Sequence, residues 1–331
     1  MAESTAGSDV VCLRPKADFL NLDVVPPVSL RIAFMQPDDE GLAAAIAATR
    51  ALVIPAVGPP LKASFFENSN IELVQVTGAG VDRLDEAALR KLGIPVANVA
   101  GGSNDAIAEF AVATALTLLR RFAWADAALR DGRYADARAE MLTAQLRGLR
   151  GLTVGIVGMG TIGTAVATAF RAMGAVIVFF DPVVETSAAI DSLGAVRLPL
   201  EELLATADVV SLHLPLNDDT RILIDENALA RMRREAILIN AARGGIVDEP
   251  ALAAALEAGS LAGAAIDVYA QEPPPADNPL LMLEGEAARR ILFTPHIAGV
   301  TRQAWVSLFQ TAWDNVVRVL ENGEPPLNRV Y

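Results

Sequence analysis

The sequence predicts an α/β protein with two doubly wound, mostly parallel sheets. Short runs rich in valine and isoleucine alternate with longer stretches rich in alanine and leucine, and this alternation is typical of parallel strands joined by crossover helices. The chain has 331 residues, which is the length of two domains of about 150 residues each. Hydrophobic residues make up 53% of the chain, so both domains have enough apolar material for a packed core.

The first third of the chain contains the weaker half of this pattern. Apolar runs predict strands at 30–34, 52–54 and 73–76, and the alanine-rich segment 41–50 predicts a helix. Residues 1–28 contain no element that we can predict, and Pro26-Pro27 is expected to form an extended hinge before the first strand at Leu30. We therefore expect an N-terminal extension of about 28 residues without an assigned role.

The rest of the chain alternates more densely. The segment 105–121 has apolar residues around nearly all of its circumference, so we expect a buried helix, packed in part against a second subunit. A polar segment at 130–150 follows. Further strands are predicted at 152–157, 176–180, 208–213, 236–240, 263–268 and 291–294. The last helix, about 301–322, is expected to begin after Thr301 as N-cap and to end at Asn322-Gly323.

Charge and cysteine content argue against several function classes. The net charge of −13 and a pI near 4.7 would repel a phosphate backbone, so we expect no nucleic-acid partner. Cys12 is the single cysteine, which leaves no internal disulfide and no cysteine-based metal site. No apolar run reaches 18 residues, and residues 1–9 hold no Lys or Arg. We therefore expect no membrane span, no targeting peptide and a cytoplasmic protein without a metal site.

A glycine-rich turn is the first motif that points to a ligand. The predicted strand 152–157 runs into Gly158-Met-Gly160-Thr-Ile-Gly163 and then into a helix. In such a motif the first glycine permits a tight turn, the second lets the backbone approach a pyrophosphate, and the third allows close packing of helix and strand. The N-terminus of the helix, with Thr161 and Ile162, presents backbone N–H groups to the phosphates. The motif therefore predicts a dinucleotide site.

Asp181 strengthens this prediction. It ends the next strand about 20 residues after the glycines, where a carboxylate would accept hydrogen bonds from both ribose hydroxyls of NAD and repel the 2′-phosphate of NADP. The sequence therefore predicts NAD as cofactor, with NADH preferred over NADPH. The simpler explanation is that Asp181-Pro182 merely ends a strand, but the complete strand–turn–helix context favours the cofactor.

Three residues at the ends of later strands carry the chemistry that a 2-oxo acid needs. Arg243 would bind the carboxylate in two-pronged fashion and polarise the carbonyl. His296 would donate a proton to the forming alkoxide, or accept it in the reverse direction. Glu272 would hold the imidazole ring and favour its protonated form. Together they predict hydride transfer at C2 of a small 2-hydroxy or 2-oxo acid.

Each of these residues also has a structural explanation. An arginine after a strand is usually solvated, a Glu-Pro pair often ends an element, and a single histidine is more often structural than catalytic. His213, followed by Pro215, is of the last kind, and we expect both to line the cofactor site. The catalytic interpretation of Arg243, Glu272 and His296 rests on their occurring together with the nucleotide turn.

The chain resembles the D-isomer-specific 2-hydroxyacid dehydrogenases over about residues 30–328. The resemblance lies in the blocks GMGTIG, SLHLPLNDDTRILI, INAARGGIVDEPALAAAL, AIDVYAQEPP and TPHIAGVT, in this order. It implies that Arg243, Glu272 and His296 are the substrate-orienting arginine, the paired acid and the catalytic histidine. The further cofactor contacts that it implies are Ala241 and Asp267, besides His296 itself.

The resemblance also implies an architecture. Residues 1–103 with 301–331 would form a flavodoxin-like substrate domain, and residues 104–300 a Rossmann-like NAD-binding domain, with a cleft between them and hinges near 101–103 and 298–299. It further implies a homodimer through the NAD-binding domain. The substrate carboxylate would lie on the backbone amides of Thr77, Gly78, Ala79 and Gly80, together with Arg243.

Three alternative functions are related to that of a 2-hydroxyacid dehydrogenase. Formate dehydrogenases have a glutamine in place of the acid, so Glu272 argues against them. A phosphite-type dehydrogenase keeps the same three residues. An NADH-binding corepressor would use the same nucleotide site, but such proteins usually carry long disordered tails, which we do not expect here.

The sequence leaves the substrate and the physiological direction open. Relatives acting on phosphorylated substrates tend to carry a basic residue after the second strand of the first domain. Here the stretch 54–60 has no cation before Lys62, although a basic residue from elsewhere could take its place. The loop fits a lactate-like, branched or aromatic side chain at least as well as a phosphate.

Overall fold

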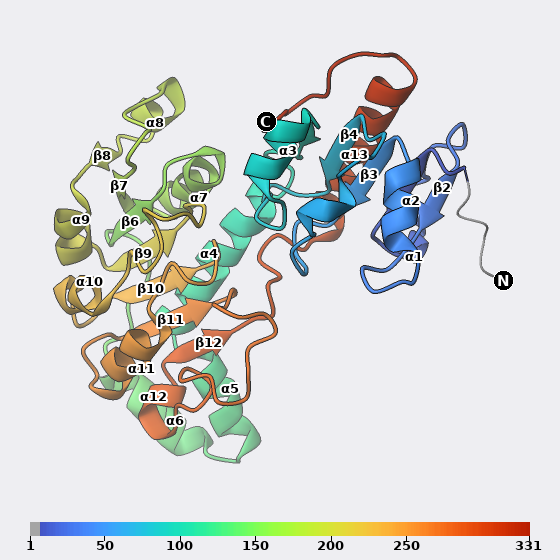
Figure 1. Cartoon of the computed structure of the whole chain (residues 1–331). Coiled ribbons are helices and arrows are strands. Elements are labelled where there is room, and N and C mark those ends of the chain that lie inside the picture. Colours follow the sequence, from blue (N-terminus) through green and yellow to red (C-terminus); the bar gives the residue numbers. More distant parts are fainter. Residues whose placement is uncertain (1–6) are drawn as a thin grey trace. The chain divides into compact units, whose positions relative to one another are not determined.

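The computed structural model describes residues 7–331, which divide into two compact units. One unit holds residues 7–103 and 300–331, and the other holds residues 104–299. Each is built around its own parallel sheet (Figure 1), so the predicted fold class is confirmed. The expectation that residues 1–9 lack a targeting peptide falls mostly on residues 1–6, outside the described part of the chain.

The first unit contains a five-stranded parallel sheet of order β2-β1-β3-β4-β5. Its strands are β1 Val10–Cys12, β2 Ile32–Phe34, β3 Ala51–Ile54, β4 Leu73–Val76 and β5 Val96–Ala97. Its helices are α1 Lys16–Leu20, α2 Leu42–Ala48, α3 Glu86–Leu92 and α13 Arg302–Leu320, with a 3₁₀ turn at Ala63–Phe65. Strand side chains alternate between two cores, one shared with α2 and α3 and the other with α1 and α13.

The first strand of this sheet corrects the sequence interpretation. We expected an extension over residues 1–28, but Val10–Cys12 is completely buried and pairs with β2 on one side and β3 on the other. Phe19 of α1 lies against Phe309 and Trp313 of α13. The apolar run 10–13 is no shorter than the run 52–54 that predicts a strand, but we interpreted Pro26-Pro27 as the entry to the first strand and therefore assigned no element to residues 1–28. Residues 10–28 therefore form the first strand–helix unit of the domain.

The second unit contains a seven-stranded parallel sheet of order β12-β11-β10-β9-β6-β7-β8. Its strands are β6 Thr153–Val157, β7 Val176–Phe180, β8 Val196–Arg197, β9 Val209–Leu212, β10 Ile237–Asn240, β11 Gly263–Ile266 and β12 Ile291–Phe293. Its helices are α4 Asn104–Leu119, α5 Phe122–Arg130, α6 Tyr134–Thr143, α7 Thr161–Ala172, α8 Ala188–Ser192, α9 Leu200–Thr206, α10 Glu226–Arg231, α11 Glu249–Glu257 and α12 Gly285–Ala288. From β6 the chain continues to β7 and β8 on one side of that strand. It then crosses back and forms β9 on the other side of β6. This reversal is the place where open α/β sheets bind nucleotides.

Helices cover both faces of this sheet. One face packs against α4, α7 and α8, and the other against α9 to α12. The predicted helix 105–121 is observed as α4, and it packs against α7 and the sheet within its own unit. The polar segment 130–150 contains α6, which we did not predict, and α5 and α6 lie together near the β12 end of the sheet (Figure 1).

The final helix has the predicted cap. The Thr301 side chain accepts a hydrogen bond from the N–H of Ala304, and Gly323 adopts a left-handed conformation shortly after the helix ends. Among residues 7–331 no helix is long and apolar enough to span a bilayer. The same residues contain no cluster of three His, Cys, Asp or Glu side chains that could hold a metal ion.

Candidate functional site

The glycine-rich turn connects β6 to α7 at the carboxyl edge of the seven-stranded sheet. Gly158 has a φ of 97°, and its N–H donates to the carbonyl of Phe180 at the end of β7, with an N–O distance of 2.8 Å. A Cβ at Gly163 would lie 1.9 Å from the carbonyl oxygen of Gly158, so only glycine permits this approach of helix and turn. The geometry therefore matches the tight turn and the close packing predicted for these two positions.

The start of α7 has the features of a pyrophosphate cradle. The helix spans Thr161–Ala172 and has Gly160 as N-cap, without a side-chain hydrogen bond to its first turn. No atom lies within 4 Å of a Cβ placed on Gly160, so the backbone there is open to a ligand. Uncapped N–H groups at a helix N-terminus attract phosphate oxygens. Thr161 and Ile162, which occupy this first turn, therefore fit a dinucleotide.

Asp181 is buried beside the glycine turn. One carboxylate oxygen accepts from the N–H of Met159 at 2.7 Å, and the other accepts from the N–H groups of Val183 and Val184 at 2.8 Å each. The residue is 5% exposed. Its carboxylate thus ties the turn between Gly158 and Gly160 to the end of β7. This structural role explains why an acid stands there, and it places the acid beside the cradle where the predicted ribose contact would be made.

His213 lies where β9 ends, on the other side of the glycine turn. Its backbone N–H donates to Val157 at 2.7 Å, and its Nε2 lies 2.8 Å from Oγ of Ser211. Burial lowers the pKa of His213 to about 3, which favours the neutral form of its ring. Nδ1 is buried without a partner in the described chain, which is consistent with a cofactor-lining position. Pro215 follows two residues later and accepts from Thr220 through its carbonyl.

Arg243 lies in the loop after β10. The amide of Asn240, which is 2% exposed, shapes this loop by donating to the carbonyl of Arg243 and accepting from the N–H of Ala242. Ala241, between them, is half-buried. A Cβ at Gly244 would lie 1.8 Å from the carbonyl oxygen of Tyr269. The loop that carries Arg243 therefore touches the loop that follows β11.

Glu272 and His296 form a hydrogen-bonded pair. Nδ1 of His296 lies 2.9 Å from Oε2 and 3.1 Å from Oε1 of Glu272. The two side chains are 26% and 28% exposed, so the pair is accessible from solvent. Oε1 of Glu272 also accepts from the N–H of Tyr269 at 3.1 Å, which fixes the carboxylate. Because Nδ1 faces the carboxylate, Nε2 is the ring nitrogen left for a substrate oxygen.

Asp267 has a role that the sequence did not reveal. Its carboxylate is completely buried, and the cofactor contact that the resemblance implies stays a prediction. The carboxylate accepts from the hydroxyl of Thr294 at 2.6 Å and from the N–H groups of Ile297 and Ala298 at 2.8 Å. Its backbone carbonyl accepts from the N–H of His296 at 2.7 Å. Asp267 therefore holds the turn that carries His296, which has a left-handed φ of 54°.

The predicted carboxylate-binding loop lies in the other unit, after β4. The N–H of Thr77 donates to the carbonyl of Ile54 at 2.8 Å, so it is not available to a substrate. Within residues 7–331 the N–H groups of Gly78, Ala79 and Gly80 donate to no protein group. These three donors, rather than all four residues, are the ones that could bind an anion through the backbone.

Arg83 was not singled out from the sequence. Its guanidinium donates to the carbonyls of Pro55 and Pro59 at 2.9 Å each, and burial lowers the pKa of Arg83. The residue is 5% exposed, and its Nη2 has no partner in the described chain. A cation from the loop after β4 therefore braces the loop 55–59, where the sequence has no cation of its own. The alternation pattern gives no signal for this contact, because the two loops are brought together only by the sheet.

The sites on the second unit share one edge of its sheet. Arg243, Glu272 and His296 follow three neighbouring strands, β10, β11 and β12, and the glycine turn follows β6. The structure pairs Glu272 with His296 directly and brings the neighbour of Arg243 against Tyr269. It likewise brings Asp181 against the glycine turn.

The chain is similar to several known proteins. The model of the D-isomer specific 2-hydroxyacid dehydrogenase NAD-binding domain matches residues 112–298. Among curated relatives, a D-3-phosphoglycerate dehydrogenase of Archaeoglobus fulgidus is 36% identical over 261 residues, 79% of this chain but only 47% of that protein. A glyoxylate reductase of Korarchaeum cryptofilum is 37% identical over 272 residues, 82% of this chain and 80% of that protein. The chain thus spans about half of the first relative and most of the second.

Solved structures of two dehydrogenases are similar to nearly the whole chain. The holo form of D-mandelate dehydrogenase from Rhodotorula graminis is 25% identical and has a TM-score of 0.84, covering 98% of this chain and 97% of that one. D-2-hydroxyisocaproate dehydrogenase is 26% identical with a TM-score of 0.80, covering 97% and 99% of the two chains.

Proposed function

Because the chain belongs to the D-isomer specific 2-hydroxyacid dehydrogenase family, we propose that it is an NAD-dependent dehydrogenase of 2-hydroxy acids, or reductase of 2-oxo acids. The observation that carries the proposal is the His296–Glu272 pair, with 2.9 Å between Nδ1 and Oε2. The pair lies at the same sheet edge as the glycine turn and Arg243. An accessible histidine held by a carboxylate is suited to transfer a proton.

Each residue has a separate task in the proposed mechanism. Arg243 binds the substrate carboxylate and polarises the C2 carbonyl, because a guanidinium offers two parallel donors and keeps its charge. Nε2 of His296 donates a proton to the oxygen as the alkoxide forms, or removes it in the oxidative direction. Glu272 holds the ring through Nδ1 and so directs Nε2 to the substrate. The nicotinamide, when bound, supplies or accepts the hydride at C2. The pyrophosphate of NAD would be held by the turn at Gly158, Gly160 and Gly163 and by the first turn of α7, with Thr161 and Ile162.

A substrate panel tests the proposal. The purified protein is mixed with NADH, and in parallel with NADPH, and the loss of reduced-nicotinamide absorbance is followed with glyoxylate, hydroxypyruvate, pyruvate, phenylpyruvate, branched 2-oxo acids and phosphohydroxypyruvate. We expect turnover with NADH on at least one acid. The acid that reacts best identifies the side chain that the pocket accepts. If NADH binds but no acid reacts, the dehydrogenase proposal is wrong, and phosphite oxidation or an NADH-sensing role would take its place.

The preference for NADH gives a prediction for Asp181. We propose that its carboxylate binds the ribose hydroxyls, and its place beside the glycine turn supports this role. Asp181→Ala should weaken NADH binding by about tenfold, because it removes a charged acceptor. It should also bring the Kd values for NADH and NADPH closer together. Both Kd values are measured by nicotinamide fluorescence. Glu185→Ala is the control, since that carboxylate is 83% exposed. An unchanged ratio in Asp181→Ala would contradict the ribose contact.

We also propose a homodimer through the α4–α6 region of the NAD-binding unit. Four large apolar side chains of α5 and α6 are exposed to between 49% and 68%, namely Phe122, Leu129, Tyr134 and Leu142. Such a patch is typical of a subunit interface. Leu142→Glu should shift the protein from dimer to monomer, as measured by light scattering after size exclusion. Val183→Glu, at an even more exposed apolar position of the same unit, should leave the dimer intact. A dimeric Leu142→Glu variant would place the interface elsewhere.

A further inference from the structure

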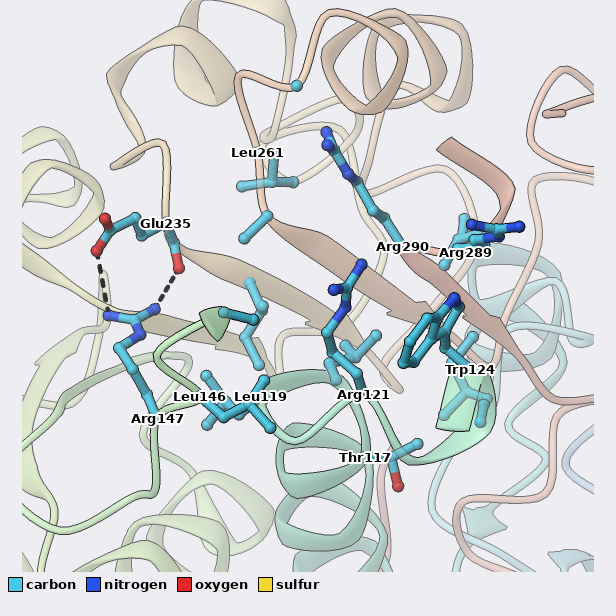
Figure 2. Close-up of a pocket in the computed structure, with 18 of the residues that line it drawn as sticks. Thr117, Leu119, Arg121, Trp124, Leu146, Arg147, Glu235, Leu261, Arg289 and Arg290 are labelled. Atoms are coloured by element: carbon cyan, nitrogen blue, oxygen red, sulfur yellow. Dashed lines mark hydrogen bonds and ion pairs between the residues drawn. The ribbon is translucent and has the colours of Figure 1, made fainter. Parts of the chain in front are cut away.

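A second pocket lies at the opposite edge of the seven-stranded sheet. It has a volume of about 690 Å³, which is within the range of small-molecule sites. Its floor is formed where β10, β11 and β12 begin, and its wall by the end of α4, the start of α5 and the segment after α6. Arg243, Glu272 and His296 follow the carboxyl ends of the same three strands. This pocket, whose lining is shown in Figure 2, is therefore distinct from the proposed catalytic site.

The lining of this pocket is cationic in an acidic protein. It contains five arginines and one acid, namely Arg121, Arg147, Arg234, Arg289, Arg290 and Glu235, whereas the whole chain has a net charge of −13. Three of the arginines pair with carboxylates. Arg147 contacts Asp208 at 3.0 Å, Arg121 contacts Glu140 at 2.9 Å, and Arg289 contacts Glu286.

The other two arginines have only carbonyl partners. Nε of Arg234 donates to the carbonyl of Gly259 at 3.1 Å, and Nη1 of Arg290 donates to the carbonyl of Leu256 at 3.4 Å. Within residues 7–331 neither has a carboxylate within 4.0 Å. The C-terminus of α11 carries a partial negative charge that attracts these cations. That negative charge is only about half an electron, so it does not neutralise the two positive guanidinium groups.

Trp124 adds a buried donor to the same pocket. The residue is 7% exposed, and its indole N–H has no hydrogen-bond partner in the described chain. The guanidinium of Arg121 lies 5.0 Å from its ring centroid, and both side chains border the hollow beside Arg290 in Figure 2. An indole N–H donates only, and a buried donor without an acceptor is unfavourable. The pocket thus lacks an acceptor.

Apolar side chains complete the walls. Leu119, Leu146 and Leu261 surround the centre of the hollow in Figure 2, with Ile237 and Leu292 also in the lining. We propose that this pocket binds a small organic anion, a carboxylate or phosphate monoester carried on an apolar body. The charged group would lie against Arg290 and Arg234, which both reach carbonyl groups at the end of α11, and the apolar body would pack on the leucines and Trp124. Because the pocket and the nucleotide turn lie at opposite strand ends, the anion should not compete with NADH.

Calorimetric titration of the NADH-saturated protein tests this site. The probes are 1-naphthyl phosphate and 1-naphthoate, with neutral 1-naphthol as control, and the first two also show which anion is preferred. We expect saturable binding of at least one anion and at least tenfold weaker binding of naphthol. Combined Arg234→Ala and Arg290→Ala substitutions should weaken anion binding at least tenfold, and Trp124→Phe should weaken it severalfold. Arg231→Ala, on α10 outside the lining, is the matched control and should change nothing.

Three results would overturn the proposal. Binding that survives the two arginine substitutions and is displaced by a 2-oxo acid would place the probe in the catalytic site. Binding that NADH abolishes would place it in the nucleotide site. Binding seen only after Leu142→Glu, and absent from the wild type, would show that a second copy of the chain fills the pocket. None of these readouts requires turnover, so the outcome is independent of the proposed dehydrogenase activity.

Discussion

Replacement of His296 by alanine should lower kcat by about a hundredfold or more and leave the Kd for NADH nearly unchanged. The ring is the group that would exchange a proton with the substrate, and its Nδ1 is held by Glu272 at 2.9 Å. The nucleotide turn at Gly158–Gly163 follows a different strand, so removing the ring should not disturb it. The measurement is single-turnover oxidation of bound NADH with the preferred acid, combined with fluorescence titration of NADH.

A second variant separates the ring from the backbone that carries it. His296 has a left-handed φ of 54°, a conformation that asparagine tolerates better than alanine. His296→Asn should therefore lose as much activity as His296→Ala but keep more thermal stability. If either variant turns over the preferred acid at the wild-type rate, His296 is not the acid–base group. A large rise in the Kd for NADH with kcat unaltered would instead make it a cofactor-binding residue.

The parts of the site that were predictable from sequence are those within one strand–loop segment. GMGTIG, Asp181, Arg243 and His296 each follow an apolar run that predicts a strand. Because all strands of the sheet are parallel, their carboxyl ends meet at one edge. The adjacency of these residues therefore followed from the alternation pattern, together with the motif spacing.

The parts that were missed depend on contacts between distant segments. Val10–Cys12 is a short apolar run whose place between β2 and β3 is set by pairing with segments later in the chain. Arg83 braces a loop more than 20 residues earlier in the chain. The arginines of the second pocket come from separate turns and look solvated when each is considered alone. In each case the contact depends on the fold and not on residues nearby in the sequence, so a local sequence pattern does not predict it.

Asp267 provides the second large effect that we expect. Its carboxylate satisfies the N–H groups of Ile297 and Ala298 and the hydroxyl of Thr294, and its carbonyl holds the N–H of His296. Asp267→Ala would leave three donors without an acceptor in the interior. At about 1–3 kcal/mol for each unsatisfied group, the free energy of unfolding should fall by at least about 3 kcal/mol. The measurement is urea denaturation followed by circular dichroism.

Asp267→Asn tests whether this loss comes from hydrogen bonding or from volume. The amide keeps the shape of the carboxylate but replaces one acceptor by a donor, which would then face the Ala298 N–H or the Thr294 and Ile297 donors. We therefore expect Asp267→Asn to lose most of the stability lost by Asp267→Ala, whereas Asp277→Ala, at an exposed acid of the following loop, should lose little. Under conditions where the variants stay folded, kcat should still fall, by at least about tenfold, because the turn after His296 loses its hydrogen bonds to the carboxylate and no longer fixes the ring. Wild-type kcat in a folded Asp267→Asn variant would mean that the turn holds its shape without this carboxylate, and that Asp267 stabilises the fold without positioning His296.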